Sequence, residues 1–292
     1  MAIDISGYTY CHEHLHIDLS KQKNDIDCRL NQYELISEEL IALKSRGVFN
    51  IIEVTNRFMG RNPQFIENLT KDTGMNILLS TGHYIEGFFS PLIYNQSAKD
   101  ISLDMIRELN IGIKDSHLKA SLIGEIGSSN NHFSTTEKKV FEAAAMAHYE
   151  TGKPISTHLS LSTMGREQIA LLKKFNVNLS AVTIGHCDLR DNLDDILWLI
   201  DQGCYIQFDT IGKNNYYPDK KRVAMLCELG KRQLLDRVML SMDITRRSHL
   251  KVNGGLGFCY LIDEFIPQLK LNGITEQHID QMLKITPYTL FK

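Results

Sequence analysis

Residues 181–188 have the sequence Ala-Val-Thr-Ile-Gly-His-Cys-Asp. This run is short, apolar and rich in β-branched side chains, which is typical of a strand that is buried on both faces of a sheet. It ends in a histidine. Similar runs recur along the chain, and several of them also end in a histidine, a glutamate or an aspartate. The sequence therefore predicts a mainly parallel sheet with polar side chains at the ends of its strands.

The spacing of these runs predicts the fold. Eight strands are expected, at Gly7–His14, Val48–Val54, Ile77–Thr81, Lys119–Glu125, Ile155–His158, Ala181–His186, Tyr205–Phe208 and Arg237–Asp243. Helical patterns lie between or after them, at Glu34–Ser45, Asp100–Leu109, Thr136–Tyr149, Arg166–Phe175, Leu193–Asp201, Lys220–Leu229 and Cys259–Lys284. This alternation, without a Gly/Pro/Ser-rich linker, favours one α/β domain over residues 1–292, built as a (β/α)8 TIM barrel.

Two doubly wound sheets are the alternative for eight strands. That fold usually carries a glycine-rich phosphate turn. The nearest candidate, Gly124-Glu125-Ile126-Gly127, lacks the G-x-G-x-x-G spacing and has a glutamate in the turn. The barrel is therefore the better interpretation.

The bulk composition is that of an ordinary globular protein, with 43% hydrophobic and 23% charged residues in a chain of 292. A net charge of −3 argues against nucleic acid or an anionic membrane as a partner. The sequence shows neither a signal peptide nor a membrane-spanning run, so we expect a cytoplasmic protein. Its six cysteines are scattered without a Cys-x-x-Cys pair, which indicates reduced thiols.

The polar residues at the strand ends are of types that bind divalent metals. His12 and His14 are two residues apart, so on a strand they point to the same face. The C-terminal ends of barrel strands form the rim where active sites are built. The residues expected to meet there are His12, His14, Glu125, His158, His186 and Asp243. Buried, clustered carboxylates are costly unless a cation compensates them, which favours a metal centre over structural packing.

Six nitrogen and oxygen ligands are what two adjacent divalent metals require. Zinc suits this set, with manganese, cobalt and iron as alternatives. Glu125 is the natural bridge, because a carboxylate can offer one oxygen to each metal. We expect His12, His14 and Asp243 to complete one metal position and the other two histidines to complete the second. A hydroxide that bridges the metals would be the nucleophile, and Asp243 would carry its proton to the leaving group.

At these residues the sequence resembles the phosphotriesterase-like branch of the amidohydrolase superfamily, and within it is similar to the bacterial phosphotriesterase homology proteins. The resemblance spans nearly the whole chain and rests on His12-Glu13-His14-Leu15-His16, Gly124-Glu125-Ile126-Gly127, Ser156-Thr157-His158, Gly185-His186-Cys187-Asp188 and Leu240-Ser241-Met242-Asp243. It implies a (β/α)8 barrel, a binuclear metal centre, and hydrolysis with Asp243 as the proton shuttle. The chain departs from the many members that bridge their metals with a carboxylated lysine where it has Glu125. Relatives in this branch hydrolyse lactones, including phosphorylated sugar lactones.

The substrate pocket is expected to draw on the loops that follow the strands. A basic, glycine-flanked loop after Asp243 carries Arg246 and His249, while Lys213 follows the seventh strand and Tyr84 the third. The basic side chains would bind an anionic group, with an arginine fork as the strongest contact. The alternative for this loop is a solvated surface segment.

The leading functional hypothesis is therefore a metal-dependent hydrolase of a small ester. The ester that we expect is a lactone, and more specifically a lactone that carries a phosphate or another anionic group. The same centre would serve a phosphotriesterase, another phosphoester hydrolase or an amide hydrolase. A barrel that binds metal or ligand without turnover is a third hypothesis, although a purely structural centre has no use for a proton shuttle such as Asp243. Barrels of this type often pair through their outer helices, so a homodimer is one expected assembly.

Overall fold

The computed structural model describes residues 2–114 and 116–292. Its central element is an eight-stranded sheet in the order β1-β4-β5-β6-β7-β8-β9-β10, so each strand pairs with the next strand of the sheet along the chain. All seven pairings are parallel. The strands are β1 (Tyr8–Glu13), β4 (Val48–Glu53), β5 (Asn76–Thr81), β6 (Ala120–Ser128), β7 (Ile155–Leu159), β8 (Val182–Gly185), β9 (Tyr205–Phe208) and β10 (Val238–Leu240).

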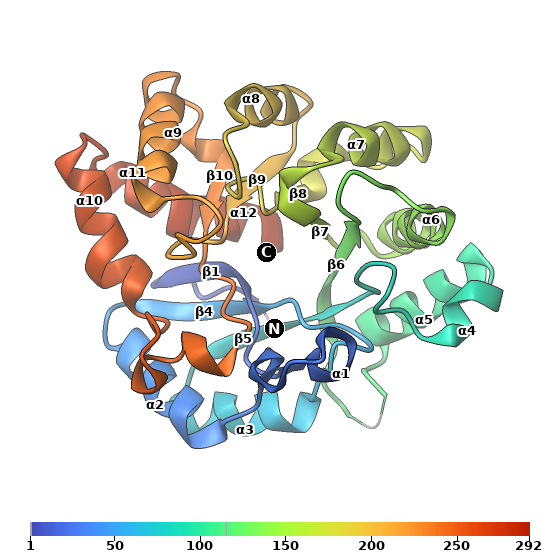
Figure 1. Cartoon of the computed structure of the whole chain (residues 1–292). Helices are drawn as coiled ribbons and strands as arrows, with labels where there is room; N and C mark the ends of the chain where they lie inside the picture. Colours follow the sequence, from blue (N-terminus) through green and yellow to red (C-terminus); the bar gives the residue numbers. More distant parts are fainter. Residues whose placement is uncertain (1, 115) are drawn as a thin grey trace.

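The first and last strands of this order lie side by side, which brings the sheet into a nearly closed barrel. The backbone N–H of His12 donates to Ser241 Oγ at 3.1 Å, and Cys11 Sγ donates to the carbonyl of Leu240 at 3.4 Å. Figure 1 shows the strands at the centre with the helices arranged around them. The predicted (β/α)8 barrel is confirmed, and the alternative of two doubly wound sheets is excluded.

Helices cover the outside of the barrel. The longer ones are α2 (Tyr33–Lys44), α3 (Pro63–Thr73), α5 (Ala98–Asn110), α6 (Thr135–Thr151), α7 (Gly165–Lys174), α8 (Leu193–Asp201) and α9 (Asp219–Lys231). The shorter elements are α1 (Ser20–Lys23), α4 (Pro91–Asn95), α10 (Ile266–Leu271), α11 (Glu276–Asp280), α12 (Thr286–Phe291) and the small antiparallel pair β2 (Ile17–Asp18) and β3 (Arg29–Leu30). Helix α6 begins with a capping box between Ser134 and Glu137 and ends at Gly152, where the backbone takes a φ of +67°.

Two helical regions differ from the sequence-based expectation. Helix α3 was not predicted, although Asn62 caps it and Pro63 occupies its first position. The region Cys259–Lys284 was predicted as continuously helical, but Gly273 interrupts it with a φ of +94°. Pro267 interrupts the hydrogen bonding earlier, because it has no N–H to donate. The C-terminal part of the chain consists of the π-helical turns η7 (Leu261–Phe265) and η8 (Gln281–Ile285) and the short helices α10, α11 and α12.

The barrel interior is packed by inward-facing side chains. They include Cys11, Ile52, Leu78, Leu122, Tyr205 and Met239, from six of the eight strands. Leu290 and Phe291 of α12 join this cluster together with Ile3, which precedes β1. The two ends of the chain therefore close the barrel at the end where its strands begin, which leaves the opposite end free for a site.

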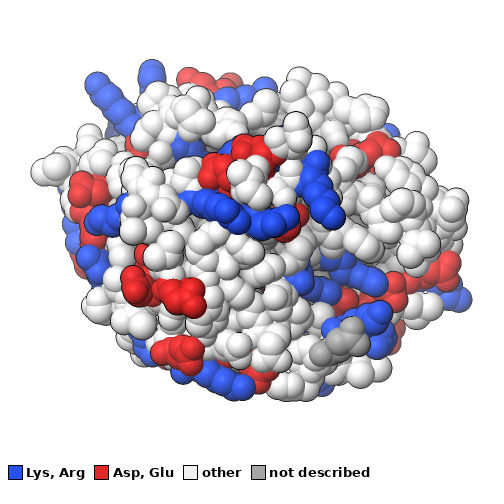
Figure 2. Space-filling model, turned by 60° about the horizontal axis from the view of Figure 1, so that its bottom comes forward, with Lys and Arg blue, Asp and Glu red and all other residues white. Residues whose placement is uncertain are grey.

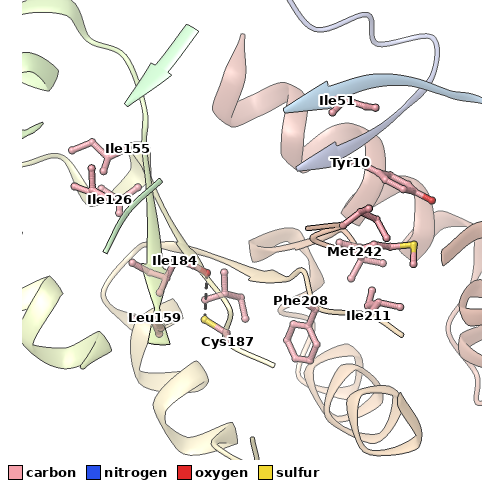
Figure 3. Packing of buried hydrophobic residues seen from close by; sticks show 14 of the residues in the cluster. Tyr10, Ile51, Ile126, Ile155, Leu159, Ile184, Cys187, Phe208, Ile211 and Met242 are labelled. Carbon is pink, nitrogen blue, oxygen red and sulfur yellow. Dashed lines mark hydrogen bonds between the residues drawn. The ribbon is translucent and has the colours of Figure 1, made fainter. Parts of the chain in front are cut away.

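A second, larger core lies between the strands and the surrounding helices. Figure 3 shows part of it, with Leu159 of β7 near Ile184 of β8 and Ile155 of β7 near Ile126 of β6. Cys187 belongs to the same cluster, and its Sγ donates to the carbonyl of Ile184 at 3.3 Å. All six cysteines are free thiols.

The surface of the molecule carries both signs of charge. Figure 2 shows basic and acidic side chains interspersed over one face, without a broad area of a single sign. Among the helices of residues 2–114 and 116–292, none has the length and apolar character that crossing a bilayer requires.

Candidate metal centre and substrate cavity

Six buried side chains meet at the C-terminal rim of the barrel. Three of them lie on β1, β6 and β7, two lie directly after β1 and β8, and Asp243 lies three residues after the end of β10. Each is at most 7% exposed, and they are His12, His14, Glu125, His158, His186 and Asp243. The structure thus brings together all six residues that the sequence singled out, from nearly the whole length of the chain. Their role as metal ligands remains a prediction.

The backbone bends sharply where some of these side chains enter the site. His186 and Asp243 have φ values of +57° and +52°. Residues other than glycine rarely adopt this left-handed backbone conformation, which costs about 1 kcal/mol or more for each residue. Gly124, directly before Glu125, has a φ of +143°, and a Cβ there would lie 2.3 Å from the carbonyl oxygen of Ser156. Glycine at this position therefore lets β6 approach β7 closely beside the site.

The carboxylate of Glu125 lies in the middle of the six side chains. Its Oε2 is 3.0 Å from His158 Nδ1, 3.5 Å from His12 Nε2 and 3.9 Å from His186 Nε2, while its Oε1 is 3.4 Å from His14 Nε2. Three subsets place their donor atoms within 4.8 Å of one another, namely His12/His14/Glu125, Glu125/His158/His186 and His12/His186/Asp243. Glu125, His12 and His186 each belong to two of them, and Glu125 is the carboxylate shared by the His12/His14 half and the His158/His186 half of the cluster.

Three of the four imidazoles are turned the same way, with Nδ1 bonded outward and Nε2 facing inward. His14 Nδ1 lies 2.7 Å from Thr55 Oγ1, and His186 Nδ1 lies 2.8 Å from Asp209 Oδ1. His12 Nδ1 lies 3.1 Å from Asp209 Oδ2. His12 Nε2 is buried and has no hydrogen-bond partner within residues 2–114 and 116–292. Since an unpartnered buried nitrogen is costly and neutral imidazole is a common metal ligand, this arrangement fits a divalent metal.

Sequence reasoning missed Asp209, although it directly follows β9 and therefore lies on the same rim. Its fully buried carboxylate contacts the rings of His12 and His186 and also accepts from the backbone N–H of His186 at 3.0 Å. Burial raises the pKa of Asp209, but the two neighbouring histidines outweigh this effect and hold the pKa below its usual value. One carboxylate thus fixes a histidine in each half of the cluster.

Replacing Asp209 with asparagine is expected to weaken metal binding at both positions by about 10–100-fold, the usual effect of losing an outer partner of a ligand. The amide would present an N–H group to one of the two imidazole N–H groups. The control is Gln207→Met. Gln207 Oε1 lies 3.0 Å from His12 Nδ1, so this variant removes a partner of His12 and leaves the partner of His186 in place. Metal titration of the chelator-treated protein measures both effects, and unchanged affinity in Asp209→Asn would contradict this role.

A cavity of about 520 Å³ opens onto the cluster. All four candidate substrate-binding residues line it, namely Tyr84, Lys213, Arg246 and His249. Lys23, which the sequence analysis did not single out, also lines it. The remaining wall is largely apolar and includes Ile17, Leu19, Met59, Ile85, Phe88, Leu161 and Leu189. The cavity can thus hold a small organic molecule with a negatively charged part.

Lys213 and Arg246 of the cavity already have acidic partners. Lys213 Nζ contacts the carboxylate of Asp243. Arg246 Nη1 donates to Asp25 Oδ2 at 2.7 Å and lies 3.5 Å from Asp27 Oδ2. The predicted basic loop is therefore tied to the segment between α1 and β3, and it is not a freely solvated surface loop.

His249 and Tyr84 contribute neutral polar groups. Burial, together with the charge of Lys213, lowers the pKa of His249 to about 4, so this imidazole is neutral at pH 7. Its Nδ1 accepts from the backbone N–H of Thr245 at 3.2 Å, which leaves Nε2 as the nitrogen that carries the proton. Tyr84 OH lies 3.3 Å from His158 Nε2, so Tyr84 contacts the metal cluster as well as the cavity.

A parallel barrel with four histidines and two acids gathered at the C-terminal ends of its strands defines a metal-dependent hydrolase of the amidohydrolase type. The comparisons name the family more closely. The chain belongs to the phosphotriesterase family, whose model matches residues 2–291.

Solved and curated relatives agree with this assignment. The chain is 55% identical to the phosphotriesterase homology protein of Escherichia coli (strain K12) over the full length of both chains. The crystal structure of that protein, complexed with phosphate in its active site, matches with a TM-score of 0.98 and covers 99% of this chain and 100% of its own. A mutant of a phosphotriesterase-like lactonase from Deinococcus radiodurans is 27% identical, with a TM-score of 0.88 and coverage of 100% and 98%. An N-acetyltaurine hydrolase from Dictyostelium discoideum is 29% identical, covering 94% of this chain and 77% of the relative.

Proposed function

We propose that this metal-dependent hydrolase cleaves the ester bond of a small lactone that carries an anionic group. The observation that carries the proposal is the position of Asp243. Its carboxylate is shared between the six-residue cluster and Lys213, at the floor of a cavity with further basic residues. A substrate placed there would meet the cluster with its carbonyl and the basic side chains with its negative charge.

The cluster suits two zinc ions, with manganese, cobalt or iron as alternatives. Glu125 would bridge them, with His12, His14 and Asp243 completing one position. His158 and His186 would complete the other. When bound, the metals would polarise the substrate carbonyl and make a water molecule between them acidic. Asp243 would take the proton of the attacking water and deliver it to the leaving oxygen.

Lys213, Arg246 and His249 would bind the anionic group. Lys213 and Arg246 supply positive charge, and the neutral His249 supplies an N–H donor that does not change between pH 5 and 8. Arg246 contacts its acidic partners through Nη1, so its other guanidinium nitrogens would donate to the ligand. The phosphate in the active site of the Escherichia coli relative supports an anionic ligand here. Tyr84 would contact the substrate and hold the imidazole of His158 in position through its hydroxyl group.

A second candidate is hydrolysis of an amide that carries an acidic group. The name of the N-acetyltaurine hydrolase relative favours it, because N-acetyltaurine is an amide with a sulfonate. The basic cavity would accommodate a sulfonate by the same contacts as a phosphate or a carboxylate. The leaving group would then be an amine, which Asp243 would also have to protonate.

The test is metal content per chain followed, on the same sample, by a panel of matched substrates. The panel pairs phosphorylated with unphosphorylated lactones and N-acetylated aminosulfonates with uncharged acetamides. We expect two metals and a kcat/KM at least about tenfold higher for the anionic lactone than for its uncharged partner, since one charge-assisted contact is worth more than about 1.4 kcal/mol. Amide turnover without lactone turnover would favour the second candidate. A protein that holds no metal after loading would overturn both, and metal without any turnover would favour a binding protein. The homodimer and the cytoplasmic location remain predictions.

A further inference from the structure

Arg222 of α9 is fully buried, although its side chain carries a positive charge that the catalytic scheme does not use. Each of the three guanidinium nitrogens has a hydrogen-bond partner. Nε donates to Asp188 Oδ2 at 2.8 Å, Nη2 donates to Thr210 Oγ1 at 2.9 Å, and Nη1 donates to Asp219 Oδ1 at 2.8 Å and to the carbonyl of Tyr217. A planar fork with three nitrogens is required to reach all of these partners at once.

Asp188 follows β8 and Asp219 is the first residue of α9, while Thr210 and Tyr217 belong to one loop, residues 209–218, which joins β9 to α9. Thr210 is at its start and Tyr217 near its end. Asp188 makes a second contact with the start of the loop, because its carboxylate accepts from the backbone N–H of Thr210 at 3.2 Å. Asp219 contacts the loop at Gly212, because its carboxylate accepts from the backbone N–H of that residue at 3.0 Å. One buried guanidinium therefore fixes the loop at several points.

The same loop carries the side chains that face the substrate cavity from this side. Lys213, Asn215 and Tyr216 all line the cavity, and Lys213 contacts Asp243. Arg222 itself does not line the cavity. Any effect of Arg222 on the site must therefore pass through its partners, and two of these, Thr210 and Tyr217, belong to the loop.

We propose that Arg222 is a positioning residue that holds loop 209–218 so that Lys213 stands beside Asp243 and faces the anionic group of the substrate. The part that concerns the substrate rests on the proposed function. The part that concerns the loop stands on the contacts alone. The competing explanation is that Arg222 only stabilises the fold as a whole.

Hydrogen exchange of the full-length, metal-loaded protein separates these explanations. In Arg222→Met we expect backbone exchange to rise at least about tenfold within residues 209–218 and to stay near the wild-type rate in the strand-end loops that contain no partner of Arg222. The matched control is Arg61→Met, since Arg61 is another nearly buried arginine, paired with Glu108 at 2.8 Å far from this loop in sequence. That variant should leave exchange in residues 209–218 unchanged.

Kinetics on the same variants test the consequence for the substrate. Arg222→Met should raise KM for the anionic substrate about tenfold, the value of one charge-assisted contact, with little change in KM for its uncharged partner. Two metals per chain should remain. If this variant does not fold, Arg222→Lys keeps the charge but not the fork and should show the same loop exchange to a smaller degree.

Unchanged exchange in residues 209–218, or exchange raised evenly across the barrel, would overturn the positioning role. Lys213→Met tests the proposed function separately. If Lys213→Met leaves KM for the anionic substrate unchanged, the anionic-substrate proposal fails, while the exchange result still decides whether Arg222 positions the loop.

Discussion

Replacing Asp243 with asparagine is expected to lower kcat by about 10³-fold while most of the bound metal is retained. General acid–base groups contribute about 10²–10⁴-fold to turnover. Asparagine keeps the shape and one oxygen for the metal, but it cannot take up a proton. His14 Nε2 lies 3.2 Å from Asp243 Oδ1, so the histidine that shares this metal position should stay in place. Steady-state kinetics and metal analysis on one preparation measure both quantities.

The matched control is Asp194→Asn, which removes an exposed carboxylate on α8 that does not line the cavity. It should leave kcat within about twofold of the wild type, as exposed charges contribute little. Turnover that survives in Asp243→Asn would contradict the proton-shuttle role. Loss of both metals in that variant would show instead that Asp243 acts mainly as a ligand.

The main features of the fold and the cluster follow from one local signal. Runs such as Val182–Gly185 are β-branched and short, and the residue after each run lies on the rim once parallel strands close into a barrel. His158 and His186 could therefore be placed together without knowledge of any contact between them. This reasoning needs the order of the strands and the period of two within a strand, which are both visible in the sequence.

The features that the sequence did not reveal depend on which side chains face one another across elements. Asp209 ends its strand like the other rim residues, but its role depends on the two imidazoles that it reaches. Arg222 lies in a helical pattern in which an arginine normally marks the solvent side, and its burial depends on Asp188 and Asp219. Arg246 was predicted to bind an anionic group, but the sequence did not reveal that Asp25 accepts a hydrogen bond from one of its nitrogens. Such pairings are set by tertiary packing and leave no periodic signal.

Glu125→Gln should abolish the proposed binuclear centre, and we expect at most one metal per chain in this variant. The carboxylate is 98% buried and has histidine nitrogens on both sides, at 3.0 Å from His158 and 3.4 Å from His14. The amide is neutral, and its N–H group would point at one set of metal ligands. The loss in affinity should therefore exceed the about 10–100-fold that outer partners of metal ligands contribute.

Glu125→Asp is the matched variant for this prediction, because it keeps the charge and withdraws the carboxylate by one methylene group. It should bind more metal than Glu125→Gln and less than the wild type. Melting curves give a second readout that does not depend on a substrate. A metal at 100 times its Kd stabilises the folded state by about 2.7 kcal/mol, which raises the melting temperature of a protein of this size by several degrees. Wild-type protein should show this rise with added zinc and Glu125→Gln should show much less of it, whereas two metals retained in Glu125→Gln would mean that Glu125 is not the bridge.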